Sequence, residues 1–234
     1  MRKSIEELLR NNPYPGRGIV IGCSEGGKRS IIIYFIMGRS ENSRNRIFER
    51  TGDGIRTAAH DPAKLTDPSL VIYHPMRRFD DTIIITNGDQ TDTILDFLKQ
   101  GHSYYTALRT RTFEPDAPHY TPRISGIVRL CGSYTLSILK SIESSPTSCQ
   151  SSFFEYTGTT PGLGHFISTY KTDGDPLPSF QGEPIPVSIT DSCGLEALAS
   201  EIWNALNEEN KVSLYAWERD LDTGEVSDLI INRH

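Results

Sequence analysis

The sequence has few cysteines and few histidines, and neither set is arranged as a metal site or a disulfide frame. The cysteines lie far apart and include no C-x-x-C pair: Cys23, Cys131, Cys149 and Cys193. Such spacing is typical of reduced thiols in a cytoplasmic protein. The six histidines are scattered and form no H-E-x-x-H motif, so the sequence predicts no metal site.

Long hydrophobic runs and an excess of positive charge are also missing. No apolar run approaches the ~20 residues that a membrane-spanning helix needs, and residues 1–12 lack the apolar core of a signal peptide. The chain carries 24 Lys and Arg against 30 Asp and Glu, a net charge of -6, whereas nucleic-acid binding calls for a basic footprint. We therefore expect a cytoplasmic protein with no membrane contact and no nucleic-acid partner.

The chain of 234 residues is long enough to bury a substantial core. It contains no internal repeat, no low-complexity tract and no segment with the composition of an interdomain linker. We expect one domain over residues 1–234. Its oligomeric state stays open, a homo-oligomer included.

Short runs of β-branched and aromatic residues recur along the chain and are interrupted by a few helical stripes. We expect helices near residues 4–11, 91–98, 104–110 and 195–206, the last starting at Asp191 or Ser192. We expect strands at 19–23, 30–37, 47–50, 55–59, 70–74, 81–86, 124–130, 134–139, 152–156, 164–171, 211–217 and 225–231. Many strands with few helices favour an α+β fold with antiparallel sheets. A layered α/β/β/α sandwich is one economical arrangement among several.

Residues 38–47, GRSENSRNRI, follow the apolar run at 31–37 directly. A loop leaving a buried strand here would present three guanidinium groups: Arg39, Arg44 and Arg46. Guanidinium is a planar, forked donor suited to phosphate and carboxylate, and the neighbouring Ser and Asn add shorter hydrogen bonds. Composition alone favours an ordinary solvated loop, so the anion-binding interpretation depends on residues elsewhere.

Further polar groups stand where strands end or irregular segments begin, as binding residues on a sheet scaffold commonly do: Arg17, Tyr73, Asn87, Gly88, Glu114, Asp116, Tyr120 and Arg123. Each alone also fits a purely structural role. Together they offer anion donors, a phenol and carboxylates, but no serine in a G-x-S-x-G motif. This set favours positioning and proton transfer on an anionic substrate over covalent catalysis. The proline-rich segment 173–186 reads as an ordered loop that could close over such a site.

Four segments, in order, resemble the archaeal-type IMP cyclohydrolases and their bacterial relatives: YPGRGIVIG, GRSENSRNR, TNGDQTD and YTPRISG. The resemblance covers roughly residues 13–128, with weaker support from 162–180. It implies closure of the purine ring of 5-formamidoimidazole-4-carboxamide ribonucleotide to IMP, with a purine ribonucleotide as ligand and no cofactor. It also implies a four-layer fold like that of the N-terminal-nucleophile hydrolases, without their amino-terminal nucleophile.

Matching the family's motifs residue by residue implies specific roles. Arg46 and Tyr73 would donate to the formyl oxygen, and Glu114 would transfer protons. Because the spacing upstream of Thr-Pro-Arg departs by about one residue, Asp116 competes with Glu114 for that role. The implied substrate-binding residues are Arg17, Arg39, Ser40, Asn45, Asn87, Gly88 and Arg123, with Arg39 and Arg17 at the phosphate.

Two other functions remain open from the residues. One is a purine-nucleotide-binding protein without turnover. The other is an amidohydrolase on a related scaffold, which would need a nucleophile exposed by processing.

Overall fold

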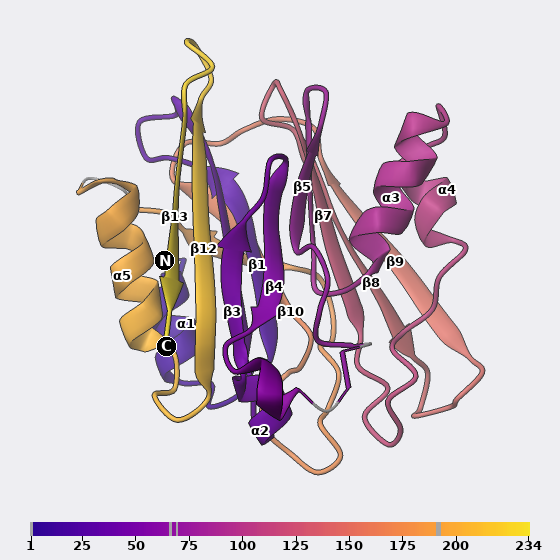
Figure 1. The fold of residues 1–234 in the computed structure, drawn as a ribbon. Helices are drawn as coiled ribbons and strands as arrows, with labels where there is room; N and C mark the ends of the chain where they lie inside the picture. The colour runs from indigo at the N-terminus through magenta and orange to yellow at the C-terminus, as the bar shows by residue number, and fades with distance from the viewer. Residues whose placement is uncertain (1, 66, 69, 191–192) are drawn as a thin grey trace.

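Two antiparallel sheets make up most of the molecule (Figure 1). The computed structural model describes residues 2–65, 67–68, 70–190 and 193–234. In these ranges the chain is α+β with few helices, as expected from the many strand-like runs.

The first sheet has six strands, with the amino-terminal hairpin near its centre. Its order is β11 (Ile185–Ser188), β10 (Leu163–Ser168), β1 (Arg17–Cys23), β2 (Arg29–Met37), β12 (Lys211–Asp220) and β13 (Val226–Asn232). Strand β2 is buried at eight of its nine positions. This burial explains its near-continuous run of β-branched and aromatic residues, since both of its faces are covered.

The second sheet is a meander of seven strands that follow one another in sequence order. They are β3 (Arg46–Arg50), β4 (Gly54–Ala59), β5 (Met76–Phe79), β6 (Thr82–Thr86), β7 (Arg123–Arg129), β8 (Tyr134–Ser141) and β9 (Cys149–Tyr156). Each strand pairs with the next in antiparallel register, so β6 and β7 join across the insertion that carries two helices.

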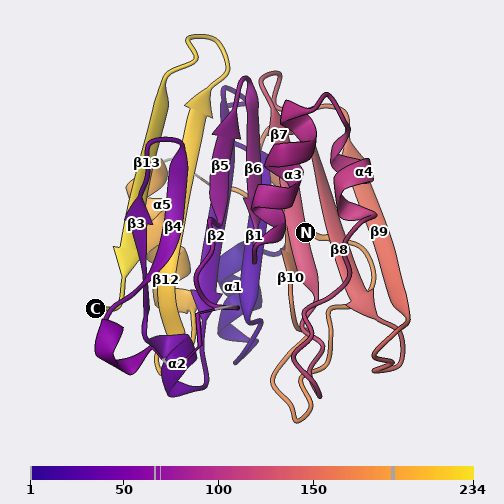
Figure 2. The same cartoon turned by 45° about the vertical axis from the view of Figure 1, so that its right-hand side comes forward.

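Helices cover the outer faces of both sheets (Figure 2). Helices α1 (Ile5–Arg10) and α5 (Gly194–Ala205) pack on the first sheet through an apolar cluster that includes Leu9, Leu198 and Ile202. Helices α3 (Gln90–Lys99) and α4 (Tyr104–Leu108) pack on the second through Ile94 and Leu108. The short α2 (Glu41–Arg44) and the 3₁₀ turn η1 (Pro62–Lys64) lie outside these layers.

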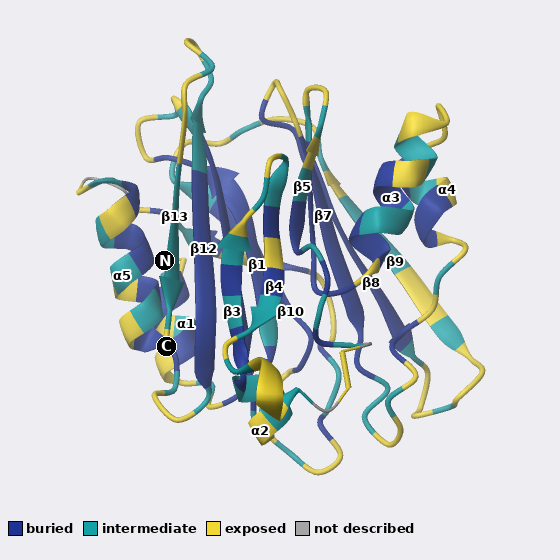
Figure 3. Cartoon of the chain, viewed as in Figure 1, coloured by how far each residue is buried: buried dark blue, intermediate teal, exposed yellow. Residues whose placement is uncertain are grey.

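A third apolar cluster joins the inner faces of the two sheets. It includes Ile21 and Tyr34 from the first sheet and Ile85 and Leu136 from the second, all fully buried. The dark strands in the centre of Figure 3 mark this layer. None of the described helices is long and apolar enough to cross a membrane.

The expected strand at 70–74 is wrong, and the strand lies instead at Met76–Phe79. The Thr57 hydroxyl donates to the Val71 and Tyr73 carbonyls, and the Tyr73 N–H donates back to that hydroxyl. Hydrogen bonds to the Thr57 side chain thus stand in for a regular ladder of strand hydrogen bonds at residues 71–73. The missed strand reads MRRF, whose two arginines conceal its pairing with β6.

Two other boundaries differ from expectation. Residues 38–47 are not one open loop, because α2 occupies their centre and Arg46 already begins β3. The loop expected at 173–186 ends where β11 begins, and the strand expected to reach residue 171 ends at Ser168. The expected helix start at Asp191 or Ser192 lies outside the described residues.

Candidate functional site

A cleft of about 310 Å³ opens at the end of the sheets where α2 lies. It is lined from β1 and β2, from the segment around α2, from residues 114–121 and from residues 170–177. Its volume is near the lower end of the range for small-molecule sites. Among the residues expected at a site, the cleft is lined by Arg17, Arg39, Ser40, Arg46, Glu114 and Asp116.

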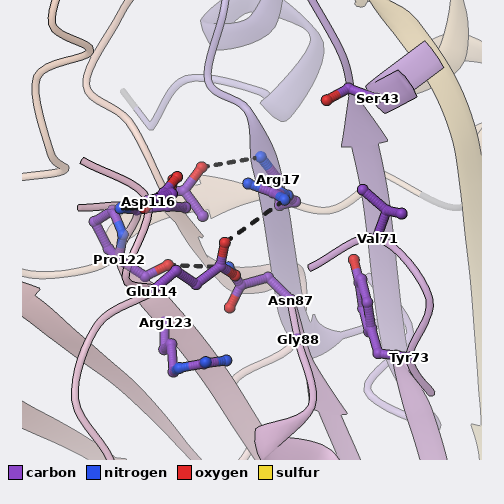
Figure 4. Close-up of polar contacts among 12 residues, drawn as sticks. Arg17, Ser43, Val71, Tyr73, Asn87, Gly88, Glu114, Asp116, Pro122 and Arg123 are labelled. Carbon is purple, nitrogen blue, oxygen red and sulfur yellow. Dashed lines mark hydrogen bonds and ion pairs between the residues drawn. The ribbon is translucent and has the colours of Figure 1, made fainter. Parts of the chain in front are cut away.

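Glu114 and Arg17 face each other at the inner part of the cleft (Figure 4). Arg17 begins β1, and its Nη2 atom lies 3.9 Å from the Glu114 carboxylate. Burial raises the pKa of Glu114 to about 7, although Arg17 and Arg123 oppose this shift. Burial alone would lower the pKa of Arg17, but the carboxylate of Glu114 raises it overall. A carboxyl poised near neutrality can both accept and return a proton.

Arg46 is only 1% exposed, so it is not the solvated loop residue that the composition allowed. Its Nε donates to the Ser43 carbonyl at 2.7 Å and its Nη2 to the Met37 carbonyl at 3.3 Å. Its Nη1 is buried without a hydrogen-bond partner in the described part of the chain. Burial lowers the pKa of Arg46. An unpaired donor on a buried guanidinium is costly and points to an anionic or carbonyl ligand.

Tyr73 lies behind the cleft lining and is 5% exposed. Its hydroxyl lies 2.8 Å from the hydroxyl of Tyr34 on β2. The phenol of Tyr73 is close enough to Arg17 and Arg46 to act on the pKa of both guanidinium groups. The structure therefore brings Tyr73 together with the two arginines.

Asn87, Gly88 and Arg123 stand beside Glu114 (Figure 4). The Asn87 amide donates to the Pro122 carbonyl at 2.9 Å and to the Glu114 carboxylate at 3.4 Å. Arg123 donates through Nη1 to Asp89 and Gln90, while its Nε is buried without a partner among the described residues. Asn87 alone of the three donates to the Glu114 carboxylate, and none of the three lines the cleft.

Arg39 and Ser40 form the outer end of the cleft. Arg39 donates to the Asp173 carboxylate at 2.8 Å and to the Gly174 carbonyl at 2.9 Å, and it lies over the Tyr14 ring. Ser40 caps α2 by accepting from the Ser43 N–H. The segment after residue 172 is thus tied to the cleft through Arg39.

Asn45 and Arg44 are not brought to the cleft. The Asn45 amide donates to the Asp61 carbonyl and accepts from the Asp61 N–H, which fixes it as a structural bridge. Arg44 donates to the Gly38 carbonyl and the Asn210 side chain. Only two of the three arginines between residues 38 and 47 therefore reach the site.

Four lining residues were not predicted as site residues: His119, Thr121, Tyr170 and Leu177. Thr121 stands in the Tyr-Thr-Pro-Arg segment that drew attention to Arg123, and its hydroxyl bonds both Asp116 and Tyr170. Asp116 also accepts from the Thr121 N–H, so Asp116 is held by this turn while Glu114 faces Arg17. Within the described residues, no group of three or more His, Cys, Asp or Glu could hold a metal ion.

Comparison with known proteins identifies relatives of this chain. The model of the IMP cyclohydrolase-like protein family matches residues 14–224. A protein of Methanopyrus kandleri named IMP cyclohydrolase is 37% identical over 115 residues, which are 48% of this chain and 57% of the relative. One of Methanothrix thermoacetophila with the same name is 29% identical over 119 residues, 49% of this chain and 57% of the relative. The matched part thus spans little more than half the length of these curated relatives. Because the family model matches most of the length of this chain, the chain belongs to the IMP cyclohydrolase-like protein family.

Proposed function

We propose that the protein is an IMP cyclohydrolase, which closes the ring of 5-formamidoimidazole-4-carboxamide ribonucleotide to IMP. The observation that carries the proposal is the buried Glu114 carboxyl, with a pKa of about 7, in a cleft with Arg17 and Arg46. The family match and the name shared by the archaeal relatives support the same activity.

Ring closure forms one C–N bond and loses one molecule of water. The carboxamide nitrogen attacks the formyl carbon, and a proton from that nitrogen ends on the former formyl oxygen. The hydroxyl then leaves with the hydrogen of the formamido nitrogen, which creates the C=N bond of the ring. Both reacting groups belong to one molecule, so orientation in the cleft can recover part of the ~7–11 kcal/mol that pre-positioning offers.

Glu114 would move the protons in this scheme. As a carboxylate it accepts the proton of the attacking carboxamide nitrogen, and as an acid it returns a proton to the departing oxygen. Asn87 donates to its Oε1 atom, and the Arg17 guanidinium lies 3.9 Å from its Oε2 atom. Asp116, the competing acid, is committed to Thr121, so we assign the role to Glu114.

Arg46 and Tyr73 would stabilise charge on the formyl oxygen. The Nη1 atom of Arg46 is buried and lacks a partner in the described residues, and Tyr73 lies beside it. A single aimed donor of this kind is typically worth about 2.7–4 kcal/mol of transition-state stabilisation. The chemistry consists of addition and dehydration, which proton transfer alone can drive without a cofactor.

The 5′-phosphate would lie at the outer end of the cleft with Arg39 and Ser40. Arg39 is the more exposed guanidinium, and its present partner Asp173 is half exposed, so a phosphate can compete for it. Arg17 would reach the ribose phosphate from the inner side. We do not assign a ligand contact to Asn45, because its amide is bonded to Asp61.

The order of layers in Figure 1, helices, sheet, sheet and helices, supports a fold of the N-terminal-nucleophile hydrolase type. We propose that residues 1–234 form one domain of this kind that acts in the cytoplasm on a purine ribonucleotide, without nucleic acid.

The test is direct conversion of the formamido ribonucleotide by the purified protein, followed by the ultraviolet absorbance of IMP. We expect product from the wild-type protein and a loss of at least a hundredfold in Glu114→Gln. No product at high protein concentration, with and without chelator, would contradict the proposal. A nucleotide-dependent thermal shift without turnover would instead identify a nucleotide-binding protein.

A further inference from the structure

Tyr34 lies in the middle of β2 and is fully buried. Its ring stacks on Phe48 with centroids 5.7 Å apart, and the surrounding cluster between the sheets is apolar. Its hydroxyl lies 2.8 Å from the Tyr73 hydroxyl. In the described residues, this phenol is the one hydrogen-bond partner of the Tyr34 hydroxyl.

Two phenols that share one hydrogen bond have two hydrogens, so one hydrogen is left over. If Tyr73 donated, the hydrogen of Tyr34 would be enclosed in the apolar cluster without an acceptor, which is costly. If Tyr34 donates, the remaining hydrogen belongs to Tyr73, which is 5% exposed behind the cleft lining, whereas Tyr34 is 0% exposed. Arg17 and Arg46 act on both phenols, but a guanidinium only donates and so accepts neither hydrogen. The burial of Tyr34 therefore selects the second arrangement.

This arrangement determines what Tyr73 can do. The donated hydrogen occupies one side of the Tyr73 oxygen, so the hydrogen of Tyr73 itself must point to another side. Hydroxyl hydrogens otherwise rotate to suit their surroundings. Without Tyr34, the Tyr73 hydroxyl would lose this constraint although its ring stayed in place.

We propose that Tyr34 is a positioning residue, whose hydroxyl donates to Tyr73 and keeps Tyr73 a hydrogen-bond donor toward the bound ligand. The inference rests on the proposed function for the identity of the acceptor, which there is the formyl oxygen. Tyr34 itself touches no reacting atom, and its whole effect passes through Tyr73.

The experiment compares Tyr34→Phe, Tyr73→Phe and the double variant with a matched control, Tyr104→Phe. Tyr104 is also buried, and its hydroxyl bonds the Ser137 hydroxyl at 2.7 Å in the cluster under α4, away from the cleft. Each single variant removes one hydroxyl from a buried phenol. The control therefore reports the effect of that loss on folding alone.

We expect Tyr34→Phe to lower kcat about tenfold with little change in KM. The ligand binds as before, and only the fixed direction of the Tyr73 hydroxyl hydrogen is lost. Loss of the donor in Tyr73→Phe lowers kcat further, by about 10²–10³. In the Tyr73→Phe background, Tyr34→Phe has no additional effect, because a residue that acts through another shows complete coupling in a double-mutant cycle. Tyr104→Phe keeps wild-type kcat.

Each outcome bears on the inference. Additive effects, or a kcat for Tyr34→Phe equal to that of Tyr104→Phe, would overturn it and leave the proposed function standing. If the wild-type protein binds the formamido ribonucleotide but forms no IMP, the proposed function fails, and calorimetric affinity for that ribonucleotide becomes the readout. Equal weakening by Tyr34→Phe and Tyr73→Phe, without further loss in the double variant, then supports the inference. A protein that neither binds the formamido ribonucleotide nor forms IMP contradicts both.

Discussion

The Arg17 guanidinium lies 3.9 Å from the Glu114 carboxylate, and the Glu114 side chain is only 2% exposed. Two opposing effects meet in this pair, since burial favours the neutral carboxyl and the guanidinium favours the charged one. Burial has the larger effect, so the pKa of Glu114 is raised to about 7. A group held between its two protonation states at neutral pH suits a reaction that first removes a proton and then returns one.

The pH dependence of catalysis should report Glu114. The carboxylate form is needed for attack, so kcat/KM should rise with pH and level off above a pKa of about 7. In Glu114→Gln the rate should fall at least a hundredfold, and the rise of kcat/KM with pH, referred to here as the pH step, should disappear. In Asp116→Asn the step should persist at lower pH, because the charge of Asp116 helps to raise the pKa of Glu114. A step that survives in Glu114→Gln and vanishes in Asp116→Asn would reverse the assignment.

The same carboxyl should make folding stability depend on pH. Its folded pKa of about 7 exceeds the usual value of 4.5, so its contribution is fully present below pH 4.5 and is lost as pH rises through 7. The free energy of unfolding of the wild type minus that of Glu114→Gln should fall by roughly 3 kcal/mol over this range, at 1.36 kcal/mol per pKa unit. Urea denaturation at several pH values measures this difference. A difference that stayed constant or increased with pH would contradict the shift.

Arg39→Ala should raise KM about tenfold or more with little effect on kcat. Arg39 would contact the phosphate, which does not react, and a hydrogen bond to a charged group is worth about 1.5–3 kcal/mol. Steady-state kinetics at two salt concentrations measure the effect. Arg56→Ala is the matched control, because the exposed Arg56 side chain on β4 pairs with Glu49 on β3, outside the cleft. Equal KM values for the two variants would place the phosphate elsewhere.

Gly88→Ala should impair catalysis through Glu114 and its supports. A Cβ atom at Gly88 would lie 2.7 Å from both Arg123 Nη1 and Gln90 Oε1, and 3.4 Å from Glu114 Oε1. Arg123 and Gln90 are bonded to each other and buried, so neither can move away without cost. Gly26→Ala is the control, since nothing lies within 4 Å of its Cβ position. We expect at least a tenfold lower kcat in Gly88→Ala alone, and equal kcat in both variants would contradict this packing argument.

The sequence predicted the main layers well where a single periodicity dominates. The run at 30–37 marked β2 because both of its faces are buried, and the stripe at 91–98 marked α3. It failed at 70–79, where the side chain of Thr57 holds an apolar segment outside the sheet while an arginine-rich segment pairs within it. Local composition does not report such long-range partners.

The candidate site was predictable only as a set of residue types. The arginines at 39 and 46 look alike in sequence, yet Arg46 is buried at the start of β3 and Arg39 is 34% exposed beside Asp173. Tyr34 was hidden inside an apolar strand because nothing in that run shows which side chain meets Tyr73. Contacts between residues 17 and 114, or 34 and 73, arise only once the two sheets are stacked.

A crystal structure of the protein with bound IMP tests the central claim most directly. We predict that the purine ring lies in the cleft within hydrogen-bonding distance of Glu114, with Arg46 and Tyr73 facing the ring and the phosphate at Arg39. IMP bound elsewhere would contradict the account, for example in the pocket that includes Arg44, Lys64 and Arg233, with Arg46 and Tyr73 left without ligand contact.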